Sequence, residues 1–195
     1  KLELACSHYK DSYEVHLATI KQRDVLFYVL LAVVAFFSLQ ITSLDLANTT
    51  LTELISNSSG VRISKDSQLL SSLVWFLLLG ASTRYFQLVL QIEREYRYLH
   101  SLEDHLGKYF PGTTMFSREG ASYLQKYPIF SNWVWFLYTI AFPSLLLAAI
   151  ILRIKAQIYS APSLVVIGFD IAAFFLIGTS IALYLIRMHG SWLVK

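Results

Sequence analysis

Four long runs of apolar residues divide the chain, with polar segments between them. The runs cover residues 25–44, 69–92, 132–154 and 163–188. Each has about 20 residues or more, which is enough for a helix to cross the roughly 30 Å hydrocarbon core of a bilayer. Backbone groups in lipid must form their hydrogen bonds internally, so the runs predict helices. The pattern therefore predicts an all-α membrane protein with four transmembrane helices.

The polar segment before the first run and the polar segment after the second run also have a helical pattern. In 1–24, apolar residues recur at steps of three and four between charged ones, and no Pro or Gly interrupts them before the first run. The second run continues with the same spacing into 93–131, as far as Gly107, which is placed for a helix C-cap. A helix over 69–106 would be about 57 Å long, nearly twice the bilayer core. We therefore predict that helical extensions project from the membrane as a stalk.

The apolar faces of these extensions need a partner to cover them. The residues that define the faces are Tyr13, Leu17, Ile20, Tyr96, Leu99, Leu102 and Leu106. Ser117 is expected to cap a further short helix over 118–126, which Pro128 ends and which can pack on the stalk. The faces can pair with one another, with other copies of the chain or with a different protein, and the sequence leaves these alternatives open.

The distribution of Lys and Arg predicts the orientation. Eleven of these residues lie in or beside the segments 1–24, 93–131 and 189–195, and four lie in or beside 45–68 and 155–162. Segments rich in basic residues stay on the cytoplasmic side of a membrane. We predict that both termini and the central segment are cytoplasmic, and that 45–68 and 155–162 form outer loops.

Two features of the polar segments could carry chemistry but have simpler interpretations. Asn48 and Asn57 each begin an N-glycosylation sequence in the outer loop, and we interpret them as ordinary residues of a polar loop. Cys6 is the only cysteine, so an intrachain disulfide is impossible. We interpret Cys6 as a small, partly buried apolar residue rather than a reactive thiol.

A polar stripe runs along the second span, toward its cytoplasmic half. Its members recur at steps of three and four and are Gly80, Thr83, Arg84, Gln87 and Gln91. An ionised side chain is costly in lipid. Either Arg84 reaches the inner headgroups while the glutamines bond neighbouring helices, or the stripe lines a subunit interface or an aqueous path.

The other spans contain three further features. Asp170 lies in the fourth span, and a pair with Arg84 is a hypothesis, although an offset of about 12 Å along the membrane normal argues against direct contact. Pro143 lies in the middle of the third span and is expected to kink it. Small residues at helical spacing in the fourth span, Gly168, Ala172, Gly178 and Ala182, would allow close helix packing.

Catalytic chemistry is not indicated. The net charge of +3 is small and the basic residues are spread along the chain, which argues against direct nucleic-acid binding. The five histidines have no spacing suited to a metal, and we interpret them as solvent-exposed. We expect no metal, no cofactor and no enzymatic activity.

The arrangement of four spans with a long helical inner region resembles the small four-span membrane components of bacterial anti-phage defence systems, such as the membrane subunit of the Kiwa system. The segment 117–128, followed by Trp133 and Trp135, resembles segments in small bacterial membrane proteins. The resemblance implies an oligomer in the bacterial inner membrane that detects infection and works with a cytosolic nucleic-acid-binding partner.

Three functions follow from these features. The first is a membrane-anchored sensor or scaffold that forms a homo-oligomer and docks a cytosolic effector through the stalk. The second is an ion channel or pore that depolarises the membrane through the Arg84 stripe. The third is a small transporter or a membrane enzyme. We rank it lowest because four spans leave little interior for a transport path and no catalytic chemistry is visible in the sequence.

Overall fold

The computed structural model describes residues 2–60, 68–110, 129–159 and 164–189. In this part of the chain every regular element is a helix. The helical stretches long and apolar enough to cross a membrane are Leu2–Thr42, Ser72–Gly107, Ile129–Ile158 and Leu164–Met188. The predicted all-α fold with four membrane-spanning helices is therefore confirmed.

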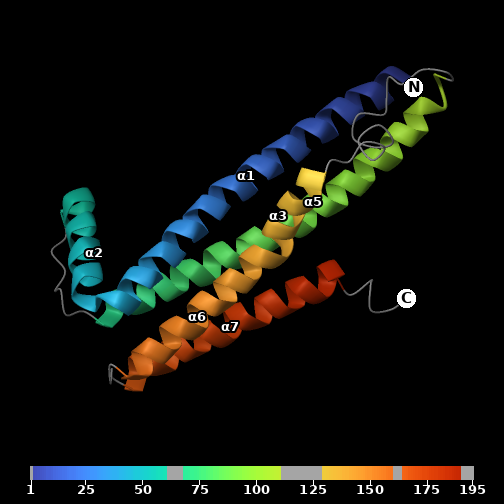
Figure 1. Ribbon diagram of the computed structural model, residues 1–195. Coiled ribbons are helices and arrows are strands. Elements are labelled where there is room, and N and C mark those ends of the chain that lie inside the picture. Colours follow the sequence, from blue (N-terminus) through green and yellow to red (C-terminus); the bar gives the residue numbers. More distant parts are fainter. Residues whose placement is uncertain (1, 61–67, 111–128, 160–163, 190–195) are drawn as a thin grey trace.

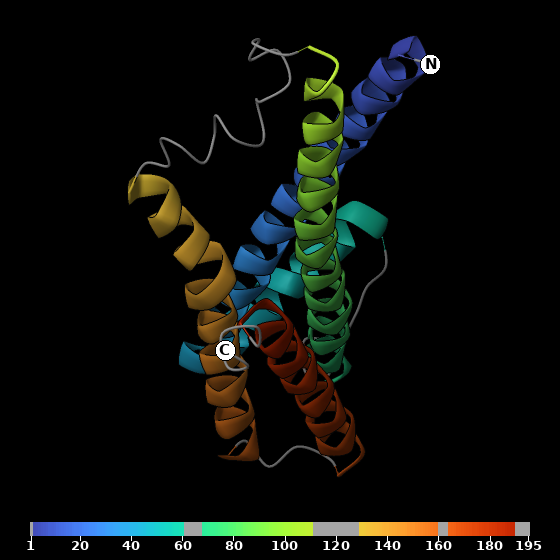
Figure 2. The same cartoon turned by 90° about the vertical axis from the view of Figure 1, so that its right-hand side faces the viewer.

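Two long helices, α1 (Leu2–Thr42) and α3 (Gln68–Gly107), pack side by side in opposite directions (Figure 1). They have 41 and 40 residues, so each is about 60 Å long. The beginning of α1 and the end of α3 extend beyond the other helices, as Figures 1 and 2 show. We call this projecting pair, residues 2–24 and 93–107, the stalk.

The third span changes its hydrogen-bonding pattern just before Pro143. It consists of α5 (Ile129–Phe136), a π-helical turn η1 (Leu137–Ala141) and α6 (Phe142–Tyr159). Proline lacks an N–H group and its ring crowds the preceding turn. The π-turn accommodates this, because the N–H of Phe142 donates to the carbonyl of Leu137, five residues back. Figure 2 shows the helix axis bending at this point.

The last helix, α7 (Leu164–His189), completes the bundle by packing on α3 and α6. Aromatic pairs connect the four spans. Phe37 of α1 lies 5.1 Å from Trp75 of α3, and Phe86 of α3 is stacked on Tyr184 of α7 at 4.5 Å, both between ring centroids. Lipid is as apolar as these side chains, so close packing rather than escape from water holds such contacts together in a membrane.

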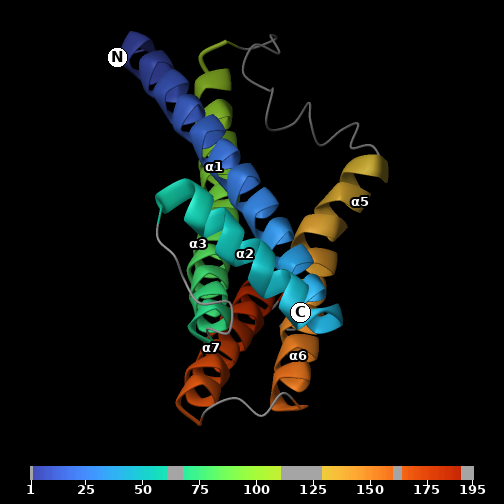
Figure 3. The same ribbon diagram turned by 90° about the vertical axis from the view of Figure 1, so that its left-hand side faces the viewer.

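The segment after the first span contains a helix that the sequence analysis missed. We predicted a polar loop for 45–68, but α2 (Leu44–Ser59) covers most of it and lies beside α1, outside the bundle (Figure 3). Gly60 ends α2 in the left-handed conformation, with φ of 71°, and its N–H donates to the carbonyl of Ser56. Ala47 is fully buried and Leu51 packs against the core, which explains why this polar segment forms a helix.

Other predicted boundaries also shift. The third span runs over 129–159 rather than 132–154, so the predicted loop at 155–162 begins within α6. Gly107 is the last residue of α3, but Gly60 is the one described glycine with positive φ, so α3 ends without a left-handed cap at Gly107. The predicted short helix at 118–126 and its cap, Ser117, lie outside the described residues.

Candidate functional site

The stalk is held together by buried polar contacts around Glu95 of α3. Its carboxylate accepts hydrogen bonds from the Thr19 hydroxyl (3.2 Å) and the Gln91 amide (2.7 Å). Nδ1 of His16 lies 3.4 Å from the same carboxylate. His16 is only 4% exposed, so our prediction of solvent-exposed histidines is wrong at this position. An acceptor on α3 allows a polar ring to be buried between two helices.

A second set of contacts lies nearer the tip of the stalk. The Tyr9 hydroxyl donates to Glu103, with an oxygen–oxygen distance of 2.7 Å. Nε2 of His8 lies 2.6 Å from the Tyr98 hydroxyl. Glu103 is buried, and the Tyr9 hydroxyl gives its carboxylate a hydrogen-bond donor there. These contacts fix the register in which α1 and α3 pair.

The predicted stalk face divides into covered and uncovered parts. Leu99 and Leu106 are buried between α1 and α3, so self-packing accounts for them. The residues that are half-buried are Tyr13, Ile20, Tyr96 and Leu102. Leu17 is 45% exposed. Pairing of α1 with α3 within one chain therefore buries the side chains at the centre of the stalk and leaves those on its flanks partly exposed to solvent.

One flank of the stalk carries exposed apolar side chains beside a hollow. Leu4 is 75% exposed and Val15 is 55% exposed, and the aromatic ring of Tyr98 is also exposed. The hollow has a volume of about 310 Å³, and Val15, Tyr98 and His8 are among the residues that line it. We call Leu4, His8, Val15 and Tyr98 the stalk patch. An apolar patch next to polar groups on a surface is typical of a protein-binding site.

The polar stripe of the second span faces away from the centre of the bundle. Gly80, Arg84 and Gln87 are exposed, and Thr83 is half-buried. The Arg84 guanidinium donates a long hydrogen bond of 3.4 Å to Gln22 of α1. Gln91 turns instead to Glu95, in the stalk. Any aqueous path along the stripe would therefore have to lie between copies of the chain.

Asp170 lies at the other end of the bundle, fully buried. It accepts hydrogen bonds from the Ser72 hydroxyl (2.8 Å) and from the Gln157 amide, and Arg153 interacts with it electrostatically. The structure does not bring Asp170 and Arg84 together. We call Ser72, Arg153, Gln157 and Asp170 the buried polar cluster.

The sequence analysis missed most of the buried polar cluster. We assigned Arg153 to the basic residues beside the outer loop, yet it is buried within α6. Gln40 of α1 is also buried, near the end of its helix. One signal in the sequence could have indicated the cluster. Polar residues occur near the same end of all four spans, and polar groups inside a membrane need polar partners.

Comparisons with known proteins give no further guide. No family model, curated protein or solved structure matches the chain. Four apolar helices and a packed interior define an integral membrane protein. Among the residues that the structure describes, no group of three or more His, Cys, Asp or Glu side chains is arranged to hold a metal ion.

Proposed function

We propose that this protein is a non-enzymatic membrane subunit that forms a homo-oligomer, senses a membrane event and docks a cytosolic protein through its stalk. The observation that carries the proposal is the stalk patch. Contacts such as Tyr9–Glu103 and Thr19–Glu95 already join α1 to α3 within one chain, and the strongly exposed Leu4 and Val15 of the patch take no part in them. A surface that stays apolar after such pairing favours a second protein.

Assembly into a homo-oligomer is supported by the outer face of α7. Ala172 and Ala182 are exposed, and a Cβ atom added at Gly168 or Gly178 would meet nothing within 4 Å. Small residues let transmembrane helices approach closely. Since no helix in the described part of the chain covers this face, a helix of another copy fits the role.

The resemblance to anti-phage membrane subunits supports one further part of the proposal. We propose on this ground that the membrane is the bacterial inner membrane and that the sensed event is phage infection. A cytosolic partner docked on the stalk would then act on the infection.

We expect Val15→Glu to weaken binding of the cytosolic partner by about tenfold or more, because it places a charge within an apolar contact. The measurement is the amount of soluble partner that co-purifies with the full-length protein from native membranes. Phage resistance of cells that carry the variant gives a second measurement.

Ser7→Glu is the matched control, because Ser7 is also exposed on α1 but lies outside the stalk patch and outside the predicted apolar face of the stalk. It should leave both measurements unchanged. Equal partner retention by the two variants would refute docking at the stalk patch. Ion flux through liposomes that contain only the purified protein, if abolished by Arg84→Ala, would favour the channel instead.

The proposed orientation places the stalk in the cytoplasm and α2 outside. In a Cys6→Ser background, a cysteine introduced by Asn57→Cys on α2 should react with a membrane-impermeant maleimide in intact cells. A cysteine introduced by Ser7→Cys in the stalk should react only after permeabilisation. Both positions are exposed, so burial does not bias the comparison. The opposite labelling pattern would reverse the orientation.

A further inference from the structure

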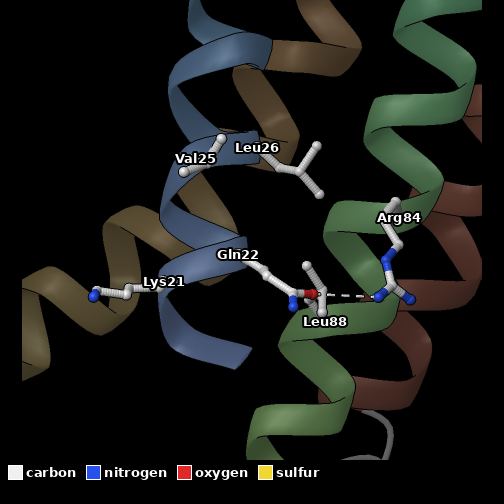
Figure 4. A pocket seen from close by; sticks show the side chains of 6 residues that line it. All are labelled: Lys21, Gln22, Val25, Leu26, Arg84 and Leu88. Carbon is white, nitrogen blue, oxygen red and sulfur yellow. Dashed lines mark hydrogen bonds between the residues drawn. The ribbon is translucent and has the colours of Figure 1, made fainter. Parts of the chain in front are cut away.

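A groove between α1 and α3 lies where the stalk joins the membrane-spanning bundle. Its volume is about 380 Å³, which is in the range of small-molecule sites. Figure 4 shows the side chains that line it, which are Lys21, Gln22, Val25, Leu26, Arg84 and Leu88. Three of them are aliphatic and two are cationic, and none is acidic. The groove therefore combines an apolar wall with a positively charged rim.

The groove lies at the level of a membrane interface. Gln22 bonds to Arg84 and lies three residues before Val25, where the first apolar run of α1 begins. At the neighbouring residue on α1, the Arg23 guanidinium lies 5.0 Å from the centre of the Tyr138 ring. One turn before Tyr138, the rings of α5 are exposed, as expected for an interfacial aromatic belt. A ligand bound in the groove would have its polar end among the lipid headgroups.

Arg84 provides the anion-binding group. Its side chain is exposed, and among the described residues it forms no ion pair with an acid. Its described partner is the neutral amide oxygen of Gln22, at 3.4 Å, which is a weak bond that an anion can replace. A guanidinium group matches the paired oxygens of a phosphate. In Figure 4 the Lys21 ammonium extends away from Arg84, so Lys21 flanks the site rather than forming its centre.

We propose that this groove binds one anionic phospholipid, with the headgroup phosphate at Arg84 and an acyl chain along Val25 and Leu26, over the buried Leu88 at the base of the groove. Charge complementarity favours an anionic lipid over a zwitterionic one, because basic pockets at the edge of the membrane concentrate negative headgroups. The apolar wall favours a lipid over a free phosphate ion. This inference is independent of docking at the stalk patch, and it gives the protein a way to respond to membrane composition.

The test is native mass spectrometry of the purified full-length protein, titrated with phosphatidylglycerol or with phosphatidylcholine of the same chain length. The wild type should bind phosphatidylglycerol more tightly than phosphatidylcholine. Arg84→Gln should weaken phosphatidylglycerol binding by about fivefold and remove the preference. Val25→Trp, which fills the apolar part without changing charge, should also reduce binding.

Two matched controls make the result specific to the groove. Arg94→Gln removes an exposed charge from the same helix outside the groove, and Leu31→Trp places the same indole side chain at another exposed site on α1. Both should bind phosphatidylglycerol as the wild type does. A size-exclusion profile of each variant checks that it is folded.

Three outcomes would overturn the proposal. The first is equal binding of the two lipids by the wild type. The second is displacement of phosphatidylglycerol by millimolar inorganic phosphate, which would indicate a simple anion site. The third is a change in oligomer mass on Arg84→Gln without any lipid preference, which would assign the groove to an interface between copies of the chain.

Discussion

Asp170→Leu is expected to destabilise the four-span bundle by about 3–5 kcal/mol. The substitution removes the acceptor that bonds Ser72 and Gln157, and it removes the negative charge that interacts with Arg153. Arg153 is itself buried, so its charge would be left without this compensation in a region of low dielectric. The measurement is the free energy of unfolding in bicelles.

A second substitution separates the cost of leaving the Arg153 charge without Asp170 from the cost of the lost packing. Arg153→Met together with Asp170→Leu should recover much of the stability, since two apolar side chains replace the two charges. Glu53→Leu is the control, because Glu53 is an exposed acid in the middle of α2 and its loss should change the free energy of unfolding by less than about 0.5 kcal/mol. If the double variant were no more stable than Asp170→Leu alone, the electrostatic contact would not be what stabilises this end of the bundle.

Leu99→Asp is expected to separate the stalk while leaving the spans packed. Leu99 is buried between α1 and α3 in the stalk, where apolar contacts also gain from the exclusion of water. Removing the side chain costs about 3–5 kcal/mol, and burying an unpaired carboxylate near Glu95 and Glu103 adds to this. Hydrogen exchange of the stalk amides in nanodiscs should accelerate by about a hundredfold or more. Amides of the spans should keep their protection.

Leu4→Asp is the matched control for that experiment. The same residue type is changed to the same acid, but Leu4 is 75% exposed. Exchange in the stalk should therefore stay close to that of the wild type. Uniform loss of protection across stalk and spans in Leu99→Asp would show that the two parts unfold together.

The spans could be predicted from the sequence because the bilayer imposes one condition on every residue within it. A run such as 69–92 must be apolar and helical wherever it packs, so its pattern is independent of its neighbours. The helix α2 lacks this constraint. Its signal was the helical spacing of Leu44, Ala47 and Leu51, which a composition rich in Asn, Ser and Thr concealed.

The buried polar contacts were harder to predict, because each depends on a partner distant in the chain. His16 and Glu95 are 79 residues apart, and Ser72 and Asp170 are 98 apart. A polar residue on an amphipathic helix looks solvent-exposed until the facing helix supplies its acceptor. Periodicity shows which side of a helix is apolar, but it does not show the register between two helices.

The unbroken length of α1 has a mechanical consequence. Its 41 residues form one rod of about 60 Å. Leu4 of the stalk patch lies near one end of this rod, and the buried Gln40 lies near the other. A straight helix without a proline or a π-turn has no built-in hinge. A torque applied at the stalk end of α1 would therefore reach the opposite end of the helix as a rotation of the same rod.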